Sequence, residues 1–479
     1  MTYKTKELLS GAKVTLIGAG VSNMPLIKYI KNYTNDISVR DKKSVSELGA
    51  RADEIRSLGA ELITGDGYLD SLDEDVIIRS PGIRPDTAPL ADAANRGAVI
   101  VCEMELFSHN APCPVFAVTG SDGKSTTTTI LSKLLTPKNG GKAYLGGNIG
   151  EPLYHKTEKM NENDLAAVEL SSFQLMNFDA PVKSAVITNI TPNHLNWHTG
   201  MDEYIAAKER ILRHAGRAVL NYENDITRML GERLITEGKT PVTWFSLSPM
   251  TVSECAGAER TLYVKDGAVF SRESDGALKQ ILKVTDIKLP GKHNIANYMA
   301  AIGAAWEYTT AERIKAVATS FGGVHHRLEF VAEKDDIRYY NSSIDSSPTR
   351  TAAAISALRD TSPDRPVIII CGGYDKNIPT GPLAETLLSE KILKAVVLTG
   401  DTKDKVKEAL TASPLLCDTS PEIRVEADFV SAVRLAASLA QKGDTVLLSP
   451  AFASFDAFPN FEVRGERFTE TVHNIIAEK

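Results

Sequence analysis

The sequence predicts an α/β protein with three domains built on parallel sheets. Short segments rich in β-branched residues alternate with helical stretches, which is typical of parallel strands covered by helices. The length of 479 residues corresponds to roughly three domains of about 150 residues each. Hydrophobic residues make up 43% of the chain and charged residues 24%, and this composition excludes a mainly disordered chain or a disulfide scaffold.

Charge and cysteine content narrow the class of partners. The net charge of -7 argues against nucleic acid or an anionic membrane as a partner. No apolar run approaches the roughly 20 residues that a membrane-spanning helix needs, and Val14–Gly18 indicates a strand entering a turn rather than a signal peptide. The five cysteines are far apart and lack metal-ligand spacing. We therefore expect a cytoplasmic protein without membrane insertion.

The first domain is expected over residues 1–111. Helical patterns cover Ser44–Leu58 and Ala88–Arg96. Strands are expected at Val14–Ile17, Asp36–Val39, Glu61–Ile63, Val76–Ile78 and Val99–Val101. This order of strands and helices predicts a Rossmann-like domain.

The turn after the first strand is a broken dinucleotide fingerprint. Gly18-Ala19-Gly20 fits its start, but Asn23 stands where the third glycine belongs. Asp41 lies where an acid would bind a ribose, although the basic residues around it, Arg40 among them, suit a phosphate better. Ligand binding and a simple tight turn both remain open. Ser80-Pro81-Gly82 ends another strand, at the edge where open α/β sheets bind ligands.

Two further domains follow, over residues 112–322 and 323–479. Pro112-Cys113-Pro114 is a plausible linker into the central one. Central strands are expected at Val115–Val118, Ala166–Leu170 and Ala185–Ile190, with a hairpin-like excursion over 250–285. The third domain repeats the α/β rhythm, with strands at Val367–Cys371, Ala395–Leu398 and Thr445–Leu448.

A phosphate-binding turn is the strongest local signal. A buried strand leads into Gly120-Ser121-Asp122-Gly123-Lys124-Ser125-Thr126, with a helix beginning at Lys124 or Ser125. Glycines let backbone N–H groups wrap a polyphosphate, and the helix N-terminus adds partial positive charge. Lys124 supplies a charge and Ser125 a hydroxyl for Mg²⁺. Val118 occupies the first glycine position of the standard loop, so this is a shorter relative; an ordinary capped βα turn is the weaker alternative.

Two residues that follow strands are candidate metal ligands. Glu169 ends a buried strand, where a carboxylate is costly unless it is paired or binds a metal. His194 follows the next strand. Because a phosphate loop precedes them, both residues are stronger candidates for Mg²⁺ ligands, together with the Ser125 hydroxyl.

Lys208 lies on the apolar face of a predicted helix over Asp202–His214, with Ile205 and Leu212 on the same face. One interpretation is that its ammonium group snorkels to water. The other is that burial lowers its pKa, and that the neutral amine then adds CO₂ to form a carbamate ligand for Mg²⁺. The sequence leaves both interpretations open.

The motifs together resemble the Mur ligases, the ATP-dependent amino-acid-adding enzymes of peptidoglycan synthesis, whose relatives include folylpolyglutamate synthases. The resemblance rests on Gly120–Thr128, Glu169–Ser172, Asn193-His194 and Tyr204–Lys208, in this order. The long motif Leu448–Phe468 is similar to that of the branch that adds D-glutamate to UDP-N-acetylmuramoyl-L-alanine. The resemblance implies a Rossmann-like first domain, a central mononucleotide-binding domain of P-loop type and a Rossmann-like third domain.

The resemblance also implies roles for individual residues. Catalytic roles are expected for Lys124, Lys208, His194 and Arg327. The ATP-binding set is Gly120, Ser121, Asp122, Gly123, Lys124, Ser125, Thr126, Asn294, Arg327 and Asp345. Metal ligands are Ser125, Glu169, His194 and carbamylated Lys208. The UDP-substrate set is Gly20, Ser22, Arg40, Ser80, Pro81, Gly82, Asn148 and Ser171, and the D-glutamate set is Lys376, Ser454 and Phe461.

The chain departs from the family pattern in two motifs. Asn193 and Asn196 stand where the family commonly has aspartates around the histidine. Ser342 and Ile344 replace the usual Asp and Lys of a third-domain motif. Asp345, shifted by three residues, is the candidate replacement for the missing carboxylate.

The expected activity is therefore an ATP-dependent ligase reaction with two Mg²⁺ ions, carried out by a monomer. D-glutamate is joined to UDP-N-acetylmuramoyl-L-alanine through an acyl phosphate. The alternatives are another Mur ligase or a folylpolyglutamate synthase, an NAD-dependent oxidoreductase that uses Gly18-Ala19-Gly20, and a non-catalytic nucleotide switch. The oxidoreductase leaves Gly123-Lys124-Ser125 without a function.

Overall fold

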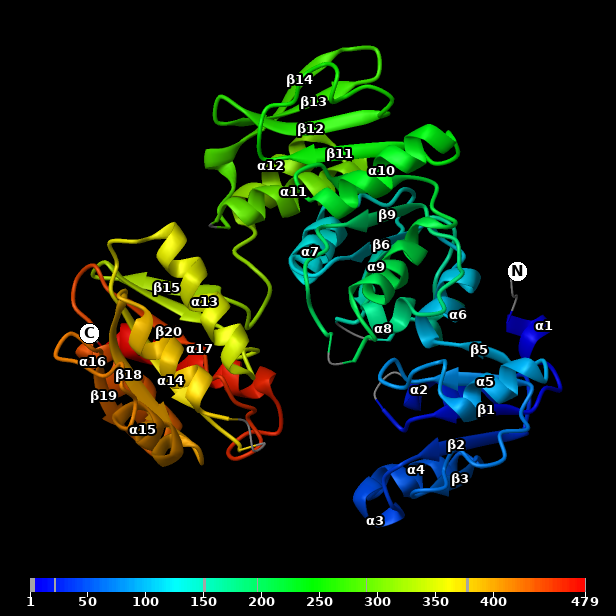
Figure 1. Ribbon diagram of the computed structural model, residues 1–479, viewed down its shortest axis with the longest axis horizontal. Coiled ribbons are helices and arrows are strands. Elements are labelled where there is room, and N and C mark those ends of the chain that lie inside the picture. The colour runs from blue at the N-terminus through cyan, green and yellow to red at the C-terminus, as the bar shows by residue number, and fades with distance from the viewer. Residues whose placement is uncertain are drawn as a thin grey trace. The chain divides into compact units, whose positions relative to one another are not determined.

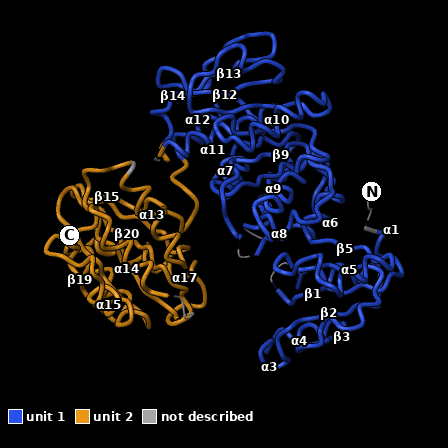
Figure 2. Tube along the Cα trace, in the orientation of Figure 1, with its two compact units in different colours: residues 1–287, 292–320 blue, residues 288–291, 321–479 orange. Residues whose placement is uncertain are grey.

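The computed structural model describes residues 5–20, 23–149, 152–195, 197–289, 291–375 and 379–478. The chain divides into two compact units, residues 1–287 with 292–320 and residues 288–291 with 321–479 (Figure 2). Parallel pairing dominates the three sheets, which confirms the predicted α/β class. The predicted boundary at residue 111 falls inside the first unit, between its two sheets, and the three-domain division stays a prediction. Across the described ranges, no helix combines the length and apolar character needed to cross a membrane.

The N-terminal sheet of unit 1 is parallel, with strand order β3-β2-β1-β4-β5 (Figure 1). Its strands are β1 Val14–Ile17, β2 Ile37–Asp41, β3 Glu61–Thr64, β4 Val76–Arg79 and β5 Val99–Val101. Its helices are α1 Thr5–Leu9, α2 Met24–Ile30, α3 Val45–Leu48, α4 Ala50–Ser57, α5 Ala88–Asn95 and α6 Glu103–Asn110. The region predicted to be helical over 44–58 is helical, and Gly49, with φ +54°, divides it into α3 and α4.

The central sheet of unit 1 has strand order β14-β13-β12-β11-β10-β9-β6-β8-β7. Its strands are β6 Val115–Thr119, β7 Ala143–Gly147, β8 Leu165–Glu169, β9 Ser184–Ile187, β10 Ala218–Asn221, β11 Val242–Ser246, β12 Arg260–Lys265, β13 Ala268–Glu273 and β14 Leu278–Lys283. Strands β12 to β14 pair antiparallel, which confirms the hairpin-like excursion. The helices are α7 Lys124–Leu134, α8 Ser172–Leu175, α9 Met201–Glu209, α10 Asp225–Glu237, α11 Lys292–Ala305 and α12 Ala311–Ser320.

One hydrophobic core joins the two sheets of unit 1. It includes Leu16 and Val39 of the N-terminal sheet, Phe107 of α6, and Ala117 and Val168 of the central sheet. Because α6 contributes its buried side chains to the same core, it connects the sheets rather than covering only one of them.

Unit 2 contains one sheet with strand order β15-β16-β20-β17-β18-β19. The strands are β15 Glu329–Lys334, β16 Ile337–Asn341, β17 Val367–Gly372, β18 Leu393–Thr399, β19 Glu422–Val425 and β20 Thr445–Leu448, of which β15 is antiparallel to its neighbour. The helices are α13 Pro348–Thr361, α14 Gly381–Ser389, α15 Lys403–Thr411, α16 Phe429–Leu439 and α17 Phe461–Glu478. Successive residues of β17 point to opposite faces, so Ile369 packs with α13, α14 and α15, and Ile368 packs with α16 and α17.

Candidate active site

The predicted phosphate loop runs from the end of β6 to the start of α7, which begins at Lys124 as predicted. Two glycines allow the loop to pack closely on its neighbours. A Cβ at Gly120 would lie 1.9 Å from Oγ1 of Thr188, and one at Gly123 would lie 2.4 Å from Oδ1 of Asn297. Gly123 also has φ +78°, a conformation that favours glycine.

The segment after β9 holds this loop in place. Asn189 accepts two hydrogen bonds, from the Ser121 N–H to its carbonyl and from the Asp122 N–H to its Oδ1, both 2.9 Å long. The Ser121 hydroxyl donates to the Thr191 carbonyl at 2.8 Å. Neither Asn189 nor Asn297 is among the residues that the sequence motifs predict. Asn297 lies one helical turn after Asn294 and donates to its Oδ1 at 3.0 Å, a spacing that could have revealed it.

Lys124 folds back over the loop that it follows. Its Nζ donates to the carbonyls of Gly120 at 3.1 Å and Ser121 at 2.9 Å. Ser125, in the first turn of α7, is buried, and Thr126 beside it is half-buried. The positive charge and the helix N-terminus therefore lie together, as polyphosphate binding requires.

Lys208 projects from α9 into the same region. The residue is only 1% exposed, and its Nζ donates to the Gly120 carbonyl at 2.7 Å and to Oγ1 of Thr119 at 3.3 Å. The interpretation that it snorkels to water is therefore wrong. Burial lowers the pKa of Lys208 well below its ordinary value, Lys124 lowers it further, and Glu169 opposes the shift. The predicted helix continues after α9 as a 3₁₀ turn over Arg210–Leu212.

Glu169, at the end of β8, has one buried oxygen that is available to a ligand. Its Oε1 accepts a 2.7 Å hydrogen bond from Nδ2 of Asn148, which follows the neighbouring strand β7. Within the described part of the chain, Oε2 is buried and has no hydrogen-bond partner. A buried carboxylate oxygen of this kind, beside a phosphate loop, fits a hard divalent cation such as Mg²⁺.

His194 lies on the exposed loop after β9, with φ +55° and its ring centroid 5.0 Å from that of Phe173. Among the residues that the structure describes, no three His, Cys, Asp or Glu side chains are close enough to hold a metal. A cation here would therefore need the Ser125 hydroxyl, phosphate oxygens or a modified Lys208 besides Glu169 and His194.

The N-terminal turn is held by its own side chains. Nδ2 of Asn23 donates to the Gly18 carbonyl at 3.0 Å and to Oγ of Ser80 at 3.2 Å, which ties the ends of β1 and β4 together. Asp41 accepts from the Ala19 N–H at 2.7 Å, so this carboxylate closes the turn. The predicted residues Gly20, Ser80, Pro81 and Gly82 gather at this edge of the sheet, and Ser22 lies outside the described residues.

Arg40 and Ser171 have structural partners of their own. The guanidinium of Arg40 is buried and donates to Oε1 of Glu74 through Nε at 3.0 Å and Nη2 at 2.9 Å. Ser171 is the N-cap of α8 and forms a capping box with Gln174. Arg40 therefore holds the segment that contains Glu74, and Ser171 fixes the start of α8.

In unit 2, predicted residues gather where β16 and β20 end. Asp345 is 5% exposed, and its Oδ2 accepts a 2.9 Å hydrogen bond from Oγ of Ser449. Burial raises the pKa of Asp345 to about 6, opposed by hydrogen bonds from Ser342 and Ser449 and by the charge of Arg327. The positive charge of Arg327 therefore favours the ionised form of the Asp345 carboxyl group.

Two of the three residues predicted to bind D-glutamate, Ser454 and Phe461, lie on the last motif of unit 2. Ser454 is buried, and Phe461 begins α17 with its ring centroid 6.2 Å from that of His326. Lys376 lies outside the described residues. Arg464 holds this motif in place, because its guanidinium donates to the carbonyls of Phe452 and Ala453, each at 3.1 Å.

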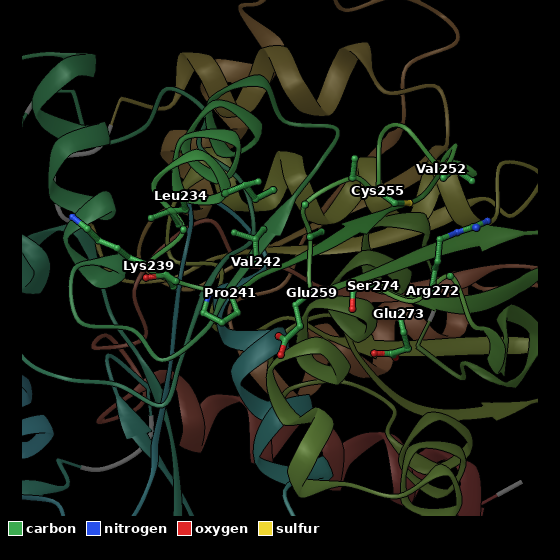
Figure 3. A pocket seen from close by; sticks show the side chains of 17 residues that line it. Leu234, Lys239, Pro241, Val242, Val252, Cys255, Glu259, Arg272, Glu273 and Ser274 are labelled. Atoms are coloured by element: carbon green, nitrogen blue, oxygen red, sulfur yellow. The ribbon is translucent and has the colours of Figure 1, made fainter.

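A pocket of about 600 Å³ in unit 1 is a separate feature (Figure 3). Its lining includes Leu234, Pro241, Cys255 and Arg272. None of the described residues that line it belongs to the predicted site, so this pocket is distinct from the phosphate loop.

Comparisons with known families agree with this geometry. Residues 118–305 match the Mur ligase middle domain, and residues 326–452 match the Mur ligase glutamate ligase domain. A phosphate loop with a buried lysine and carboxylate, in a chain that carries both domains, defines an ATP-dependent, amide-bond-forming ligase.

Full-length relatives narrow the assignment. The UDP-N-acetylmuramoylalanine–D-glutamate ligase of Clostridium perfringens is 43% identical over 474 residues, with 98% of each chain covered. The enzyme of the same name from Clostridium novyi is 42% identical over 475 residues, again with 98% of each chain covered. The chain belongs to the Mur ligase family.

Solved structures support the fold. The UDP-N-acetylmuramate–alanine ligase MurC of Thermotoga maritima aligns with a TM-score of 0.53 at 17% identity, covering 98% of this chain and 100% of that one. A UDP-N-acetylmuramoyl-L-alanyl-D-glutamate–2,6-diaminopimelate ligase aligns with a TM-score of 0.53 at 16% identity, covering 83% of this chain and 92% of that one. At these identities the likeness concerns the fold alone.

Proposed function

We propose that this enzyme joins D-glutamate to UDP-N-acetylmuramoyl-L-alanine with hydrolysis of ATP to ADP and phosphate, in the cytoplasm and as a monomer. The observation that carries the proposal is the closed phosphate loop with Lys124, Lys208 and Glu169 around it. Relatives that are 39–43% identical over 98% of the chain, and that are named for this reaction, support the choice of substrates. The motif Leu448–Phe468 also favours the D-glutamate branch.

The chemistry requires activation of a carboxylate. Its oxygen attacks the γ-phosphorus of ATP, ADP leaves, and an acyl phosphate forms. The D-glutamate amine then attacks the carbonyl carbon and loses a proton, and phosphate leaves through a tetrahedral intermediate. The protein would contribute mainly positioning and charge neutralisation, the latter from Lys124 and the N-terminus of α7.

Two Mg²⁺ sites are part of the proposal. Ser125 and Glu169 would hold one ion, and His194 with carbamylated Lys208 would hold the other. When bound, such ions neutralise phosphate charge and polarise the oxygens that react. Lys208 suits the carbamate because burial favours its neutral amine, which is the form that adds CO₂.

The remaining residues divide by substrate. Asn294 would lie at the adenine, and Arg327 at the γ-phosphate with Asp345 as its neighbouring carboxylate. Gly20, Ser22, Ser80, Pro81, Gly82, Asn148 and Ser171 would bind the UDP-substrate, whereas the Arg40 guanidinium holds the segment 68–74 through the carbonyls of Tyr68 and Asp70. Lys376, Ser454 and Phe461 would bind D-glutamate. Most of the UDP-substrate set lies in the proposed domain 1–111, most of the ATP set in 112–322, and the D-glutamate set in 323–479.

Phosphate release tests the proposal directly. The purified chain is given UDP-N-acetylmuramoyl-L-alanine, ATP and Mg²⁺, and release is measured with D-glutamate, with L-glutamate and with neither. We expect release that depends on D-glutamate, together with a product heavier than the UDP-substrate by one glutamyl residue. Release that ignores D-glutamate, or that L-glutamate supports equally, would overturn the assignment.

A further inference from the structure

Two loops of unit 1 meet at Trp197. One is the turn after β4, which carries Gly82 and Arg84, and the other is the loop after β9, which carries His194. The indole Nε1 of Trp197 donates to the Gly82 carbonyl at 3.3 Å, and Arg84 Nη1 donates to the Trp197 carbonyl at 2.8 Å. The Arg84 guanidinium also lies 5.0 Å from the centre of the indole ring. The proposed UDP-substrate turn and the His194 loop are therefore joined directly.

Glu203 of α9 binds Arg84 through both carboxylate oxygens. Arg84 Nη2 donates to Oε1 at 2.7 Å, and Nη1 donates to Oε2 at 3.1 Å. The Thr199 N–H also donates to Oε2, at 3.0 Å. The two side chains are 20% and 21% exposed, so solvent screens the pair only in part. Arg84 lowers the pKa of Glu203 to about 2, so the carboxylate is ionised at neutral pH.

His198 continues the chain of contacts toward the metal residues. Its side chain is fully buried, with Nδ1 2.9 Å from Oε2 of Glu203 and Nε2 2.9 Å from Oγ of Ser172. Ser172 begins α8, three residues after Glu169. The order serine, histidine, carboxylate is that of a hydrolase triad. Ser172 is only 2% exposed, however, so no substrate reaches its hydroxyl and the arrangement serves positioning.

The N–H groups of Trp197 and His198 also donate to the His194 carbonyl, each at 3.0 Å, so the contacts reach from the UDP-substrate turn to one proposed metal residue. We propose that Arg84, Glu203 and His198 are positioning residues that couple binding of the nucleotide-sugar substrate to the affinity of the site for Mg²⁺. The inference rests on the proposed function and deepens it. By linkage, each ligand then improves binding of the other by the same factor. D-glutamate, which the proposed function assigns to residues of unit 2, lies outside this coupling.

Glu203→Gln is the decisive variant, because it keeps the shape and removes the charge that Arg84 and His198 share. Glu259→Gln is its matched control. Glu259 holds Arg217 with equivalent geometry, Nε to Oε2 at 2.7 Å and Nη2 to Oε1 at 2.9 Å, but it belongs to the segment before β12. Equal losses of thermal stability in the two variants would show that each has lost one charge pair.

Two measurements follow. Calorimetric titration with UDP-N-acetylmuramoyl-L-alanine, without ATP, is carried out with and without Mg²⁺. Steady-state rates give KM for the UDP-substrate and for D-glutamate, and the half-saturating concentration of Mg²⁺. In Glu203→Gln we expect about tenfold weaker binding of the UDP-substrate, about tenfold more Mg²⁺ for half-saturation, and loss of the mutual enhancement. KM for D-glutamate should stay within about twofold. Arg84→Met should change the same constants in the same direction. The double variant with Glu203→Gln and Arg84→Met should bind the UDP-substrate no more weakly than the single variant with the lower affinity.

The outcomes separate the two proposals. If the wild-type chain shows no D-glutamate-dependent phosphate release, the proposed function fails, and the inference fails with it. If the wild-type chain is active but Glu203→Gln binds the UDP-substrate and Mg²⁺ as the wild type does, the inference alone is overturned. It is also overturned if KM for D-glutamate rises as much as the other constants, because that result indicates general disruption.

Discussion

Lys208 shows how surroundings decide the chemistry of a single residue. The sequence shows that Lys208 lies on the apolar face of α9, but it does not show where the Nζ of the side chain points. In the fold its Nζ lies against the Gly120 carbonyl, 2.7 Å away, in a region that already contains Lys124. Two cationic groups in one buried region favour the neutral amine of the more buried one.

The carbamate role of Lys208 can be tested by chemical rescue. Lys208→Ala should lose activity by about 100-fold or more, because it removes both the amine and the proposed ligand oxygens. Added short carboxylates such as acetate should restore part of the rate by supplying an oxygen ligand. Lys133→Ala, at an exposed position of α7, is the control and should keep wild-type rates in both conditions. Full activity of Lys208→Ala would exclude the carbamate.

Asp345 allows a test of whether the carboxylate that the family has at position 342 is supplied here from position 345. Asp345→Ser should lower kcat/KM for ATP by about tenfold or more, because the carboxylate whose pKa the charge of Arg327 lowers is lost. The Asp345 N–H donates to the Ser342 carbonyl at 3.0 Å, and the Ser342 Oγ accepts from the Leu328 N–H at 3.0 Å, next to Arg327. Moving the acid back in Ser342→Asp with Asp345→Ser should therefore restore most of the activity. A double variant as poor as Asp345→Ser alone would contradict this.

At the scale of elements, glycine placement controls the geometry of the site. The break between α3 and α4 at Gly49 and the tight phosphate loop both depend on backbone conformations that other residues rarely adopt. A helical pattern in the sequence does not reveal which glycine takes positive φ, because that choice depends on what the chain meets in space.

A pair of glycines separates crowding from backbone strain. Gly123 and Gly140 have similar φ angles, +78° and +76°, but a Cβ at Gly123 would meet Asn297 whereas one at Gly140 would meet nothing within 4 Å. Gly123→Ala should raise KM for ATP about tenfold or more, because the loop must move off α11. Gly140→Ala should cost only about 1 kcal/mol of stability and leave KM unchanged. Similar kinetics in the two variants would contradict the expectation.

At the scale of the whole molecule, α6 joins two sheets into one core, and this connection has an electrostatic cost. Glu103 of α6 is buried, and its Oε1 accepts from the N–H groups of Leu153 at 3.0 Å and Tyr154 at 2.8 Å. Desolvation raises the pKa of Glu103 to about 7, although these hydrogen bonds oppose the shift.

Stability of unit 1 should therefore depend on pH. Since the folded pKa lies above the ordinary value of 4.5, the folded state binds this proton more tightly, and the free energy of unfolding falls as pH rises from about 4.5 to about 7. Glu103→Gln keeps the acceptor oxygen and removes the ionisation. It should flatten this decline and raise stability at pH 8 by up to about 3 kcal/mol.

The measurement is urea unfolding followed by tryptophan fluorescence at pH 5 and pH 8. All three tryptophans, Trp197, Trp244 and Trp306, lie in unit 1, so the signal reports that unit. Glu162→Gln, at an exposed position, serves as the control. Parallel pH curves for Glu103→Gln and the wild type would show that Glu103 does not titrate in this range.

Much of the fold could be predicted because it rests on local patterns. Buried parallel strands such as β1, β6 and β20 are continuous apolar runs, and the glycine turn after β6 has few alternatives. The same local logic located Lys124, Glu169 and Lys208, since each stands next to a strand end or on a helix face.

Local patterns could not predict which residues contact one another across the fold. Asn189, Asn297 and the path from Arg84 through Glu203 to His198 join residues as many as 170 positions apart. Hydrogen bonds of this kind depend on distance and direction in space, which sequence spacing encodes only within one helix or strand. The amino-acid sequence thus sufficed for the α/β class, the phosphate loop and the family resemblance. The burial of Lys208, the buried Oε2 of Glu169 and the contacts that hold the loops required the folded chain, because desolvation and pairing arise only when distant segments pack together.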